Sequence, residues 1–247
     1  MLRLILIAFF ALVSVFARAA EPPRDTLWLA TTLRAAPGEL KNLIEDLKAL
    51  EKQAFYSHGD RIAPLIMRHS QGDQWDLMLL EPIGSFSEFF APERLKSEAR
   101  NTFESAETLG NLEARIAYKD ELFAYGPSYE FVKAYTKGKN FFHIEMFEAL
   151  PGMDQKLLEQ REMENAYLVA TKRRGNLIFD GVMGTNVDSF TIGAYDNLAA
   201  FAARPDLKEG ASLKAAKDAG FADDNSIGFY LRTLISAHHD TLANRVK

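Results

Sequence analysis

A histidine and a glutamate two residues apart are the strongest candidates for chemistry in this 247-residue chain. His143 and Glu145 lie in segment 141–147, which is rich in β-favouring residues and predicts a strand. Because successive side chains of a strand point to opposite faces, residues two apart project side by side. An imidazole beside a carboxylate in a partly dry site can donate and accept protons. The pair therefore predicts a proton-transfer site on one face of this strand.

Other residues with catalytic potential are scarce. The chain has no Cys, which excludes disulfides and thiol chemistry, and it has no Gly-rich phosphate loop or nucleophile elbow. His238 and His239, followed by Asp240, are neighbours in the sequence, and adjacent side chains rarely bind one metal together because they point in different directions. No H-x-x-E-H-type signature adds a third ligand to His143 and Glu145. No metal site is therefore predicted.

An internal repeat predicts the elements that hold these residues. Pro37-Gly38 recurs as Pro151-Gly152, an offset of 114, and Gly72 recurs as Gly184, an offset of 112. Tyr118 and Leu122 match Tyr230 and Leu234, again at 112. Each copy predicts strand, helix, two hairpin strands, helices and a closing strand. The predicted segments are 26–33, 40–50, 62–69, 75–80, 86–109 and 121–125 in the first copy, and 141–147, 153–171, 177–182, 190–195, 198–219 and 228–235 in the second.

This β-α-β-β-α-β order defines a ferredoxin-like unit, and the fold class is α+β with two such units in tandem, over residues 21–135 and 136–247. The arrangement resembles the dimeric α/β-barrel superfamily, which includes antibiotic-biosynthesis-type monooxygenases, NIPSNAP-like proteins and chlorite dismutase. The resemblance implies that the two sheets face each other in one intrachain barrel with the helices outside. Because the superfamily includes enzymes, haem proteins and proteins of unknown activity, the fold alone selects no function.

Closure of the barrel would turn alternate residues of each central strand inward. The apolar residues at 142, 144 and 146 suit the helix-covered face, so the other row is expected to face a cavity. Such a cavity would have mostly apolar walls and one polar end, as pockets for small hydrophobic molecules do. In the alternative, the strand is shorter or its register is reversed, and both polar groups reach solvent at the barrel rim. The predicted lining is Phe141, His143, Glu145, Phe147 and, from the first copy, Leu29.

Two charged residues occupy equivalent positions in the repeat. Alignment of Gly72 with Gly184 places Arg68 opposite Asp180. The two could form an ion pair across the barrel, or Arg68 could hold a ligand carboxylate through its planar fork. The alternative is a pair of exposed charges that protect edge strands from aggregation. A further basic run, Lys172-Arg173-Arg174, falls at a predicted helix end, where cations offset the helix dipole without any ligand.

The first twenty residues predict a secretory signal. Arg3 precedes an apolar run over 4–16, and Ala17-Arg18-Ala19-Ala20 offers small residues for cleavage. We therefore expect a periplasmic or secreted protein. Cleavage lowers Lys+Arg from 29 to 27 against 34 Asp+Glu, a net charge of about −7. This balance argues against nucleic acid and an anionic membrane as partners, and no second run is long enough to span a bilayer.

The leading functional hypothesis is an exported protein that binds a small hydrophobic molecule in the barrel, with His143 and Glu145 as polar contacts. Cofactor-independent oxidation or isomerisation is what the family resemblance implies. No cofactor is predicted, and haem is not expected because no His lies between Phe147 and Ala237 to serve as a ligand on a second-unit helix. The alternative is a non-catalytic periplasmic structural or interaction protein whose barrel is filled by side chains. A monomer with an internal pseudo-dimer, or a weak homodimer, is expected.

Overall fold

The computed structural model describes residues 21–52 and 62–247. The predicted signal, residues 1–20, lies outside the described residues. Within the described ranges no helix is both long and apolar enough to cross a membrane.

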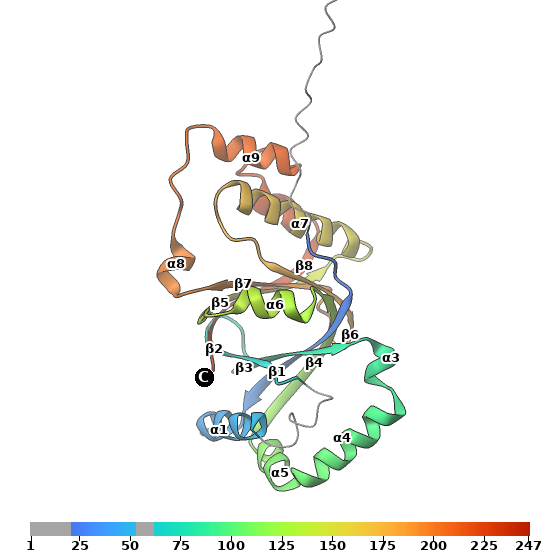
Figure 1. The fold of residues 1–247 in the computed structure, drawn as a ribbon. Coiled ribbons are helices and arrows are strands. Elements are labelled where there is room, and N and C mark those ends of the chain that lie inside the picture. Colours follow the sequence, from blue (N-terminus) through green and yellow to red (C-terminus); the bar gives the residue numbers. More distant parts are fainter. Residues whose placement is uncertain (1–20, 53–61) are drawn as a thin grey trace, which may run out of the picture.

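Two halves with the same order of elements form the chain (Figure 1). The first half contains β1 (Thr26–Ala35), α1 (Leu40–Glu51), β2 (Leu65–Gln71), β3 (Leu77–Gly84), α3 (Phe86–Phe89), α4 (Pro92–Glu104), α5 (Ala106–Ala114) and β4 (Ile116–Gly126). The second contains β5 (Phe141–Ala149), α7 (Asp154–Ala170), β6 (Leu177–Met183), β7 (Ser189–Tyr195), α8 (Leu198–Ala202), α9 (Ala211–Ala219), α10 (Ile227–Arg232) and β8 (Ile235–Arg245). Helix α6 (Tyr129–Thr136) joins the halves, and the predicted boundary between residues 135 and 136 falls at its end. The predicted tandem of ferredoxin-like units is confirmed.

The eight strands close into one barrel in the order β1-β3-β2-β8-β5-β7-β6-β4. Closure comes from pairing between the halves, because β2 pairs with β8 and β4 pairs with β6. Helices α1, α4 and α5 cover one side of the barrel, and α7, α8 and α9 cover the opposite side (Figure 1). Every strand is therefore paired on both edges.

Two equivalent glycines allow this closure. Gly72 and Gly184 follow β2 and β6 with φ of +122° and +121°. A Cβ on Gly72 would lie 2.0 Å from the carbonyl oxygen of Asp240, and one on Gly184 would lie 1.9 Å from that of Glu121. Each glycine thus lets a hairpin of one half touch the closing strand of the other.

Substitution of either glycine by alanine is expected to lower the free energy of unfolding by about 2 to 4 kcal/mol, because it adds a backbone clash to an unfavourable φ. Gly110 is the matched control, since it lies inside α5 with no atom within 4 Å of an added Cβ. Gly110→Ala should stabilise by about 0.5 to 1 kcal/mol. Urea denaturation measures both effects, and equal behaviour of Gly184→Ala and Gly110→Ala would contradict this account of closure.

Large apolar side chains fill the barrel interior. The residues at 142, 144 and 146 of β5 belong to one buried cluster with Trp28 and Ala30 of β1. In that cluster the rings of Phe179 and Phe190 are stacked with centroids 4.4 Å apart. The predicted orientation of β5 is therefore wrong. The predicted cavity lining, Phe141, His143, Glu145, Phe147 and Leu29, lies on the alternate, helix-covered face of β5 and β1.

The orientation of β5 could not be read from hydropathy, because both faces of β1 and β5 are buried and an apolar row does not reveal which face it occupies. A closed barrel interior offers no water to unpaired polar groups and therefore takes the fully apolar row. The outer face opens to solvent where the helices end, and it can hold His143 and Glu145.

The last predicted strand is also wrong. Segment 228–235 contains most of helix α10, and β8 begins at Ile235. The repeat offset is not constant, because β4 begins at residue 116 and β8 begins 119 residues later. This shift places His238, His239 and Asp240 in the middle of a strand. Their side chains alternate, so His239 lines a hollow at the barrel mouth while Asp240 lies beside Glu145.

Candidate functional site

A pocket of about 280 Å³ lies between the outer face of the sheet and helices α7 and α8. We term it the sheet–helix pocket. Its polar and aromatic lining includes His143, Glu145, Glu164, Lys172, Arg173, Arg174, Asn176, Tyr195, Phe201 and Arg204. The predicted proton-transfer pair thus lines a pocket, although not the barrel cavity that the sequence suggested.

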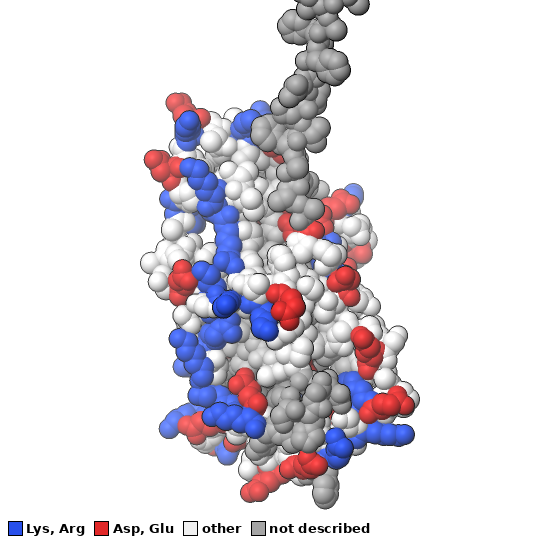
Figure 2. All heavy atoms as spheres, in the orientation of Figure 1, with Lys and Arg blue, Asp and Glu red and all other residues white. Residues whose placement is uncertain are grey.

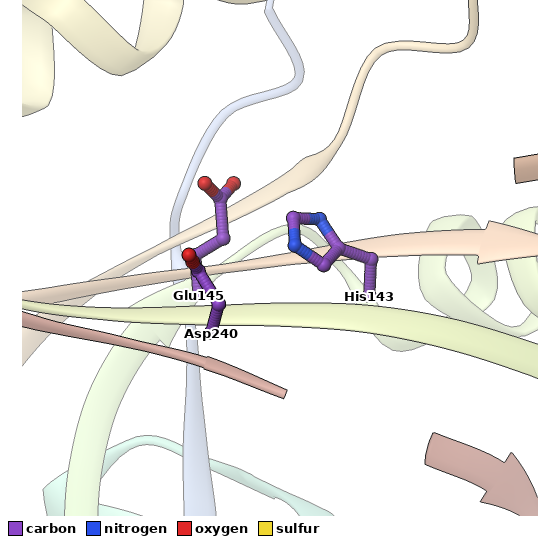
Figure 3. A group of neighbouring side chains, drawn as sticks. All are labelled: His143, Glu145 and Asp240. Atoms are coloured by element: carbon purple, nitrogen blue, oxygen red, sulfur yellow. The ribbon is translucent and has the colours of Figure 1, made fainter. Parts of the chain in front are cut away.

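His143 and Glu145 rise from β5 to the same side of the sheet (Figure 3). Asp240 is the register partner of Glu145 on β8. One nitrogen or oxygen of each of these three side chains lies within 4.8 Å of the others. The imidazole of His143 lies against Phe201 of α8, with ring centroids 4.9 Å apart. No hydrogen bond to the imidazole is found among the described residues, so His143 remains available to a ligand.

Arg161 of α7 forms an ion pair with Glu145. Its Nη1 lies 3.8 Å from Glu145 Oε2, its Nη2 lies 2.7 Å from Glu164 Oε2, and its Nε donates to Gln160 Oε1 at 2.7 Å. The Arg161 side chain is only 2% exposed. Thr191 of β7 donates a hydrogen bond to Glu145 Oε2 at 2.9 Å. Glu145 is therefore a buried carboxyl with one weak ion pair and one hydrogen bond.

Burial raises the pKa of Glu145 above its ordinary value, outweighing the opposite effects of Arg161 and His143, while Glu164 and Asp240 raise it further. A carboxyl of this kind keeps its proton to higher pH than an exposed one. It can therefore donate that proton to a bound molecule.

The raised pKa predicts a pH-dependent contribution to stability. The folded state binds the Glu145 proton more tightly, so the stabilisation is complete below the ordinary pKa of 4.5 and is lost as pH rises through the folded-state value. Glu145→Gln removes this dependence. The free energy of unfolding of the variant relative to the wild type should therefore increase between pH 4 and pH 8 in urea titrations. A difference that does not vary with pH would show that Glu145 titrates normally.

Tyr195 forms the neighbouring wall. Burial is the main reason that its pKa is raised to about 12, so the phenol stays protonated at neutral pH. Gly193 lies opposite His143 on β7, and a Cβ there would come within 2.9 Å of the Tyr195 oxygen and 2.8 Å of Asn176 Oδ1. The absence of a side chain at Gly193 thus leaves room for both of these side chains.

Three arginines give the pocket a cationic side. Figure 2 shows Lys and Arg side chains along the left edge of the molecule, from the region of α9 past α8 down to α1, although the whole chain is acidic. Arg174 stacks on Tyr135 with its Cζ 3.8 Å from the ring centroid. Its Nε and Asn176 Oδ1 are shielded from solvent without a hydrogen-bond partner. Unpaired buried polar atoms are rare in native proteins, and two beside one pocket indicate a place for a polar ligand group.

The structure does not bring Arg68 and Asp180 together. Arg68 is exposed on β2 and lines a shallow hollow near the C-terminus. Asp180 lines a separate hollow with Arg24 and Tyr125, and burial raises its pKa. Of the alternatives that the sequence leaves open, the ion pair across the barrel does not form, because the two residues line separate hollows.

The structure offers a possible cation site that the sequence analysis did not expect. His143, Glu145 and Asp240 present one nitrogen and two carboxylate oxygens, a donor set that suits a divalent metal. The guanidinium of Arg161 beside Glu145 disfavours a second positive charge at this position. Asp240 could not be assigned to this site from the sequence, because it reaches Glu145 only through the pairing of β5 with β8.

No family model matches the chain, and no curated protein matches it in sequence. An anthrone oxidase-like protein matches 90% of this chain and 92% of its own, with a TM-score of 0.58 and 13% identity. The chain has the dimeric α/β-barrel fold. Candidate monooxygenases from Lactobacillus acidophilus and Fusobacterium nucleatum each match 90% of the chain with a TM-score of 0.51, at 7% and 10% identity, and are covered over 95% and 93% of their lengths. The narrower resemblance to NIPSNAP-like proteins stays a prediction.

The sequence argument against haem does not hold. A chlorite dismutase variant from Candidatus Nitrospira defluvii and a haem-binding protein from Thermus thermophilus each match 90% of this chain, with TM-scores of 0.46 and 0.41 and identities of 12% and 11%. The sequence argument required a helical His, but the structure places His143 on a strand beneath the helices, in one pocket with Arg173 and Arg174. Imidazole and guanidinium fit the iron and the carboxylates of haem. When bound there, haem would supply an iron for redox chemistry.

Proposed function

We propose that the sheet–helix pocket binds a small acidic aromatic molecule, such as a phenol or an anthrone, and that the chain oxidises it with dioxygen. The observation that carries the proposal is the imidazole of His143, which has no hydrogen bond among the described residues, beside the carboxyl of Glu145, whose pKa is raised by burial. Both lie in a pocket walled by Phe201 and Tyr195. Arg174 gives an anionic group of the ligand a partner. The fold shared with an anthrone oxidase-like protein supports this reaction class.

The reaction needs a proton to leave before dioxygen can react. His143 would accept a proton from the acidic ring CH2, which leaves an electron-rich anion held near the arginines. The anion transfers electrons to dioxygen, a C–O bond forms, and His143 returns its proton to the outer oxygen to give a hydroperoxide. His143 would then take the second methylene proton as the O–O bond breaks, while Glu145 protonates the departing hydroxide, so that the carbon becomes C=O and the other oxygen leaves as water. Transfer of the proton from His143 to Glu145 restores both groups.

Export is a separate proposal. It rests on the charge and apolar pattern of residues 1–20 and would place the chain in the periplasm or outside the cell.

Oxygen uptake with anthrone as substrate tests the proposed activity. We expect one dioxygen consumed for each anthraquinone formed, at a rate well above that in buffer, and with no loss after treatment with a chelator. Binding without turnover would favour the alternative of a non-catalytic protein. Turnover that a chelator abolishes and a divalent metal restores would contradict direct oxidation and favour a metal at His143, Glu145 and Asp240. Proton exchange at the methylene without oxygen uptake would favour an isomerase.

A further inference from the structure

A second and larger hollow adjoins the sheet–helix pocket. It is a groove of about 950 Å³ lined by residues of helices α6, α7 and α9. Helices α7 and α9 lie on one side of the barrel, and α6 crosses in front of its strands (Figure 1). Its walls are mostly apolar and include Phe131, Tyr135, Ala166, Val169, Ala215 and Ala219. Phe131 is 44% exposed and Val169 is 54% exposed. Exposed apolar side chains around a concave surface are typical of a site for an apolar partner.

Two acidic and two basic side chains line the groove: Glu21, Asp218, Lys214 and Arg174. Lys214 and Asp218 of α9 both line it and pair with each other. Arg174 lines it too and has no carboxylate within ion-pair distance in residues 21–52 and 62–247. Its only hydrogen bond there goes to the carbonyl oxygen of Tyr135, and its Nε is shielded and unpartnered. An unpaired donor of a guanidinium group is costly when buried, and a carboxylate relieves that cost.

Arg174 and Asn176 also line the sheet–helix pocket, so the two hollows meet at this point. A molecule whose anionic group lies at Arg174 can therefore extend an apolar chain along the groove.

We propose that the groove between α6, α7 and α9 binds the hydrocarbon chain of an amphiphilic carboxylate, whose anionic group Arg174 holds. The site does not depend on proton transfer by His143, and only its use as a substrate subsite rests on the proposed function. Because the walls are apolar along the length of the groove, affinity should rise with chain length. Full burial of one methylene corresponds to a gain of about fourfold in affinity.

Calorimetric titration of the full chain with dodecanoate, octanoate and dodecan-1-ol, all below their micellar concentrations, tests the site. We expect dodecanoate to bind at least about tenfold more tightly than octanoate, and about tenfold more tightly than the uncharged alcohol. Arg174→Gln should abolish the preference for the carboxylate and leave binding of the alcohol unchanged. Arg173→Gln is the matched control, because Arg173 lies outside the groove and stacks on Tyr167.

Two further variants separate this site from the proposed activity. Val169→Asp changes an exposed groove residue and should weaken binding of both twelve-carbon ligands. His143→Gln should lose oxidation and retain dodecanoate binding. Equal affinity of the wild type for octanoate and dodecanoate would overturn the groove as a chain site. Equal loss of the preference for carboxylate over alcohol in Arg173→Gln and Arg174→Gln would overturn the role of Arg174. The Arg174→Lys variant keeps the positive charge and should bind dodecanoate with an affinity between those of the wild type and Arg174→Gln.

Discussion

Replacement of Arg161 by methionine is expected to lower the free energy of unfolding by about 3 to 5 kcal/mol. Arg161 is almost fully buried between Glu145 and Glu164, and its guanidinium also stacks on Phe147, 4.5 Å from the ring centroid. Methionine preserves much of the packing volume but leaves two carboxyl groups without a cation. Chemical denaturation at neutral pH measures the loss.

A double-mutant cycle tests the cause. Glu145→Gln in the Arg161→Met background removes one of the two stranded carboxyls and should recover part of the lost stability. Arg173→Met is the control, because its guanidinium stacks on Tyr167 at the partly exposed end of α7 and should contribute less than about 1 kcal/mol. A cycle in which the two substitutions add independently would mean that Arg161 acts through packing alone.

Replacement of His143 by glutamine is expected to lower kcat for anthrone oxidation by about 10² to 10⁴, which is the usual contribution of a positioned acid or base. Glutamine keeps a polar side chain of similar size but cannot accept the proton. KM should change little, because Arg174, Phe201 and Tyr195 remain to hold the ligand. Steady-state oxygen uptake gives both constants.

His239→Gln is the matched control for this experiment. His239 is half exposed in the hollow at the barrel mouth, where Trp75 and Met146 are its neighbours in the lining. Its replacement should leave kcat unaltered. A similar loss in both variants would remove the basis for assigning proton transfer to His143.

The repeat made the fold predictable from the sequence. Gly72 and Gly184 were matched by type and spacing, and the structure shows that both make the same close contact with the other half. The offset of 112 residues between equivalent positions does not hold at the closing strands β4 and β8, because the second half has a longer segment before its closing strand. Helix α6 was missed, although Ser128 is a sequence signal for its start and accepts a hydrogen bond from the Phe131 amide.

The pair of His143 and Glu145 could be predicted because it depends only on strand periodicity. The face of the sheet on which the pair lies could not be predicted, since hydropathy does not distinguish two buried faces. Asp240 reaches the site through strand register, which one sequence does not specify. The sequence gives a weak indication that Arg161 is buried, because residues three and four apart lie on one face of a helix and the predicted helix buries Leu157 and Leu158.

The sequence does not distinguish Arg174 from its basic neighbours. A basic run at a helix end has a sufficient electrostatic explanation in the helix dipole, and nothing in the sequence indicates that one member of the run is shielded from water. Its proposed role rests on the fold, in which its side chain lines two adjoining hollows.

Imidazole NMR provides the most direct test of where the ligand binds. The chain has five histidines, so selectively labelled imidazoles give few signals, and single substitutions assign His143 and His239. On titration with a soluble anthraquinone carboxylate, we expect the His143 signals to shift with saturation while those of His239 stay in place. Shifts of His239 without shifts of His143 would place the ligand at the barrel mouth and contradict a functional site between the sheet and the helices.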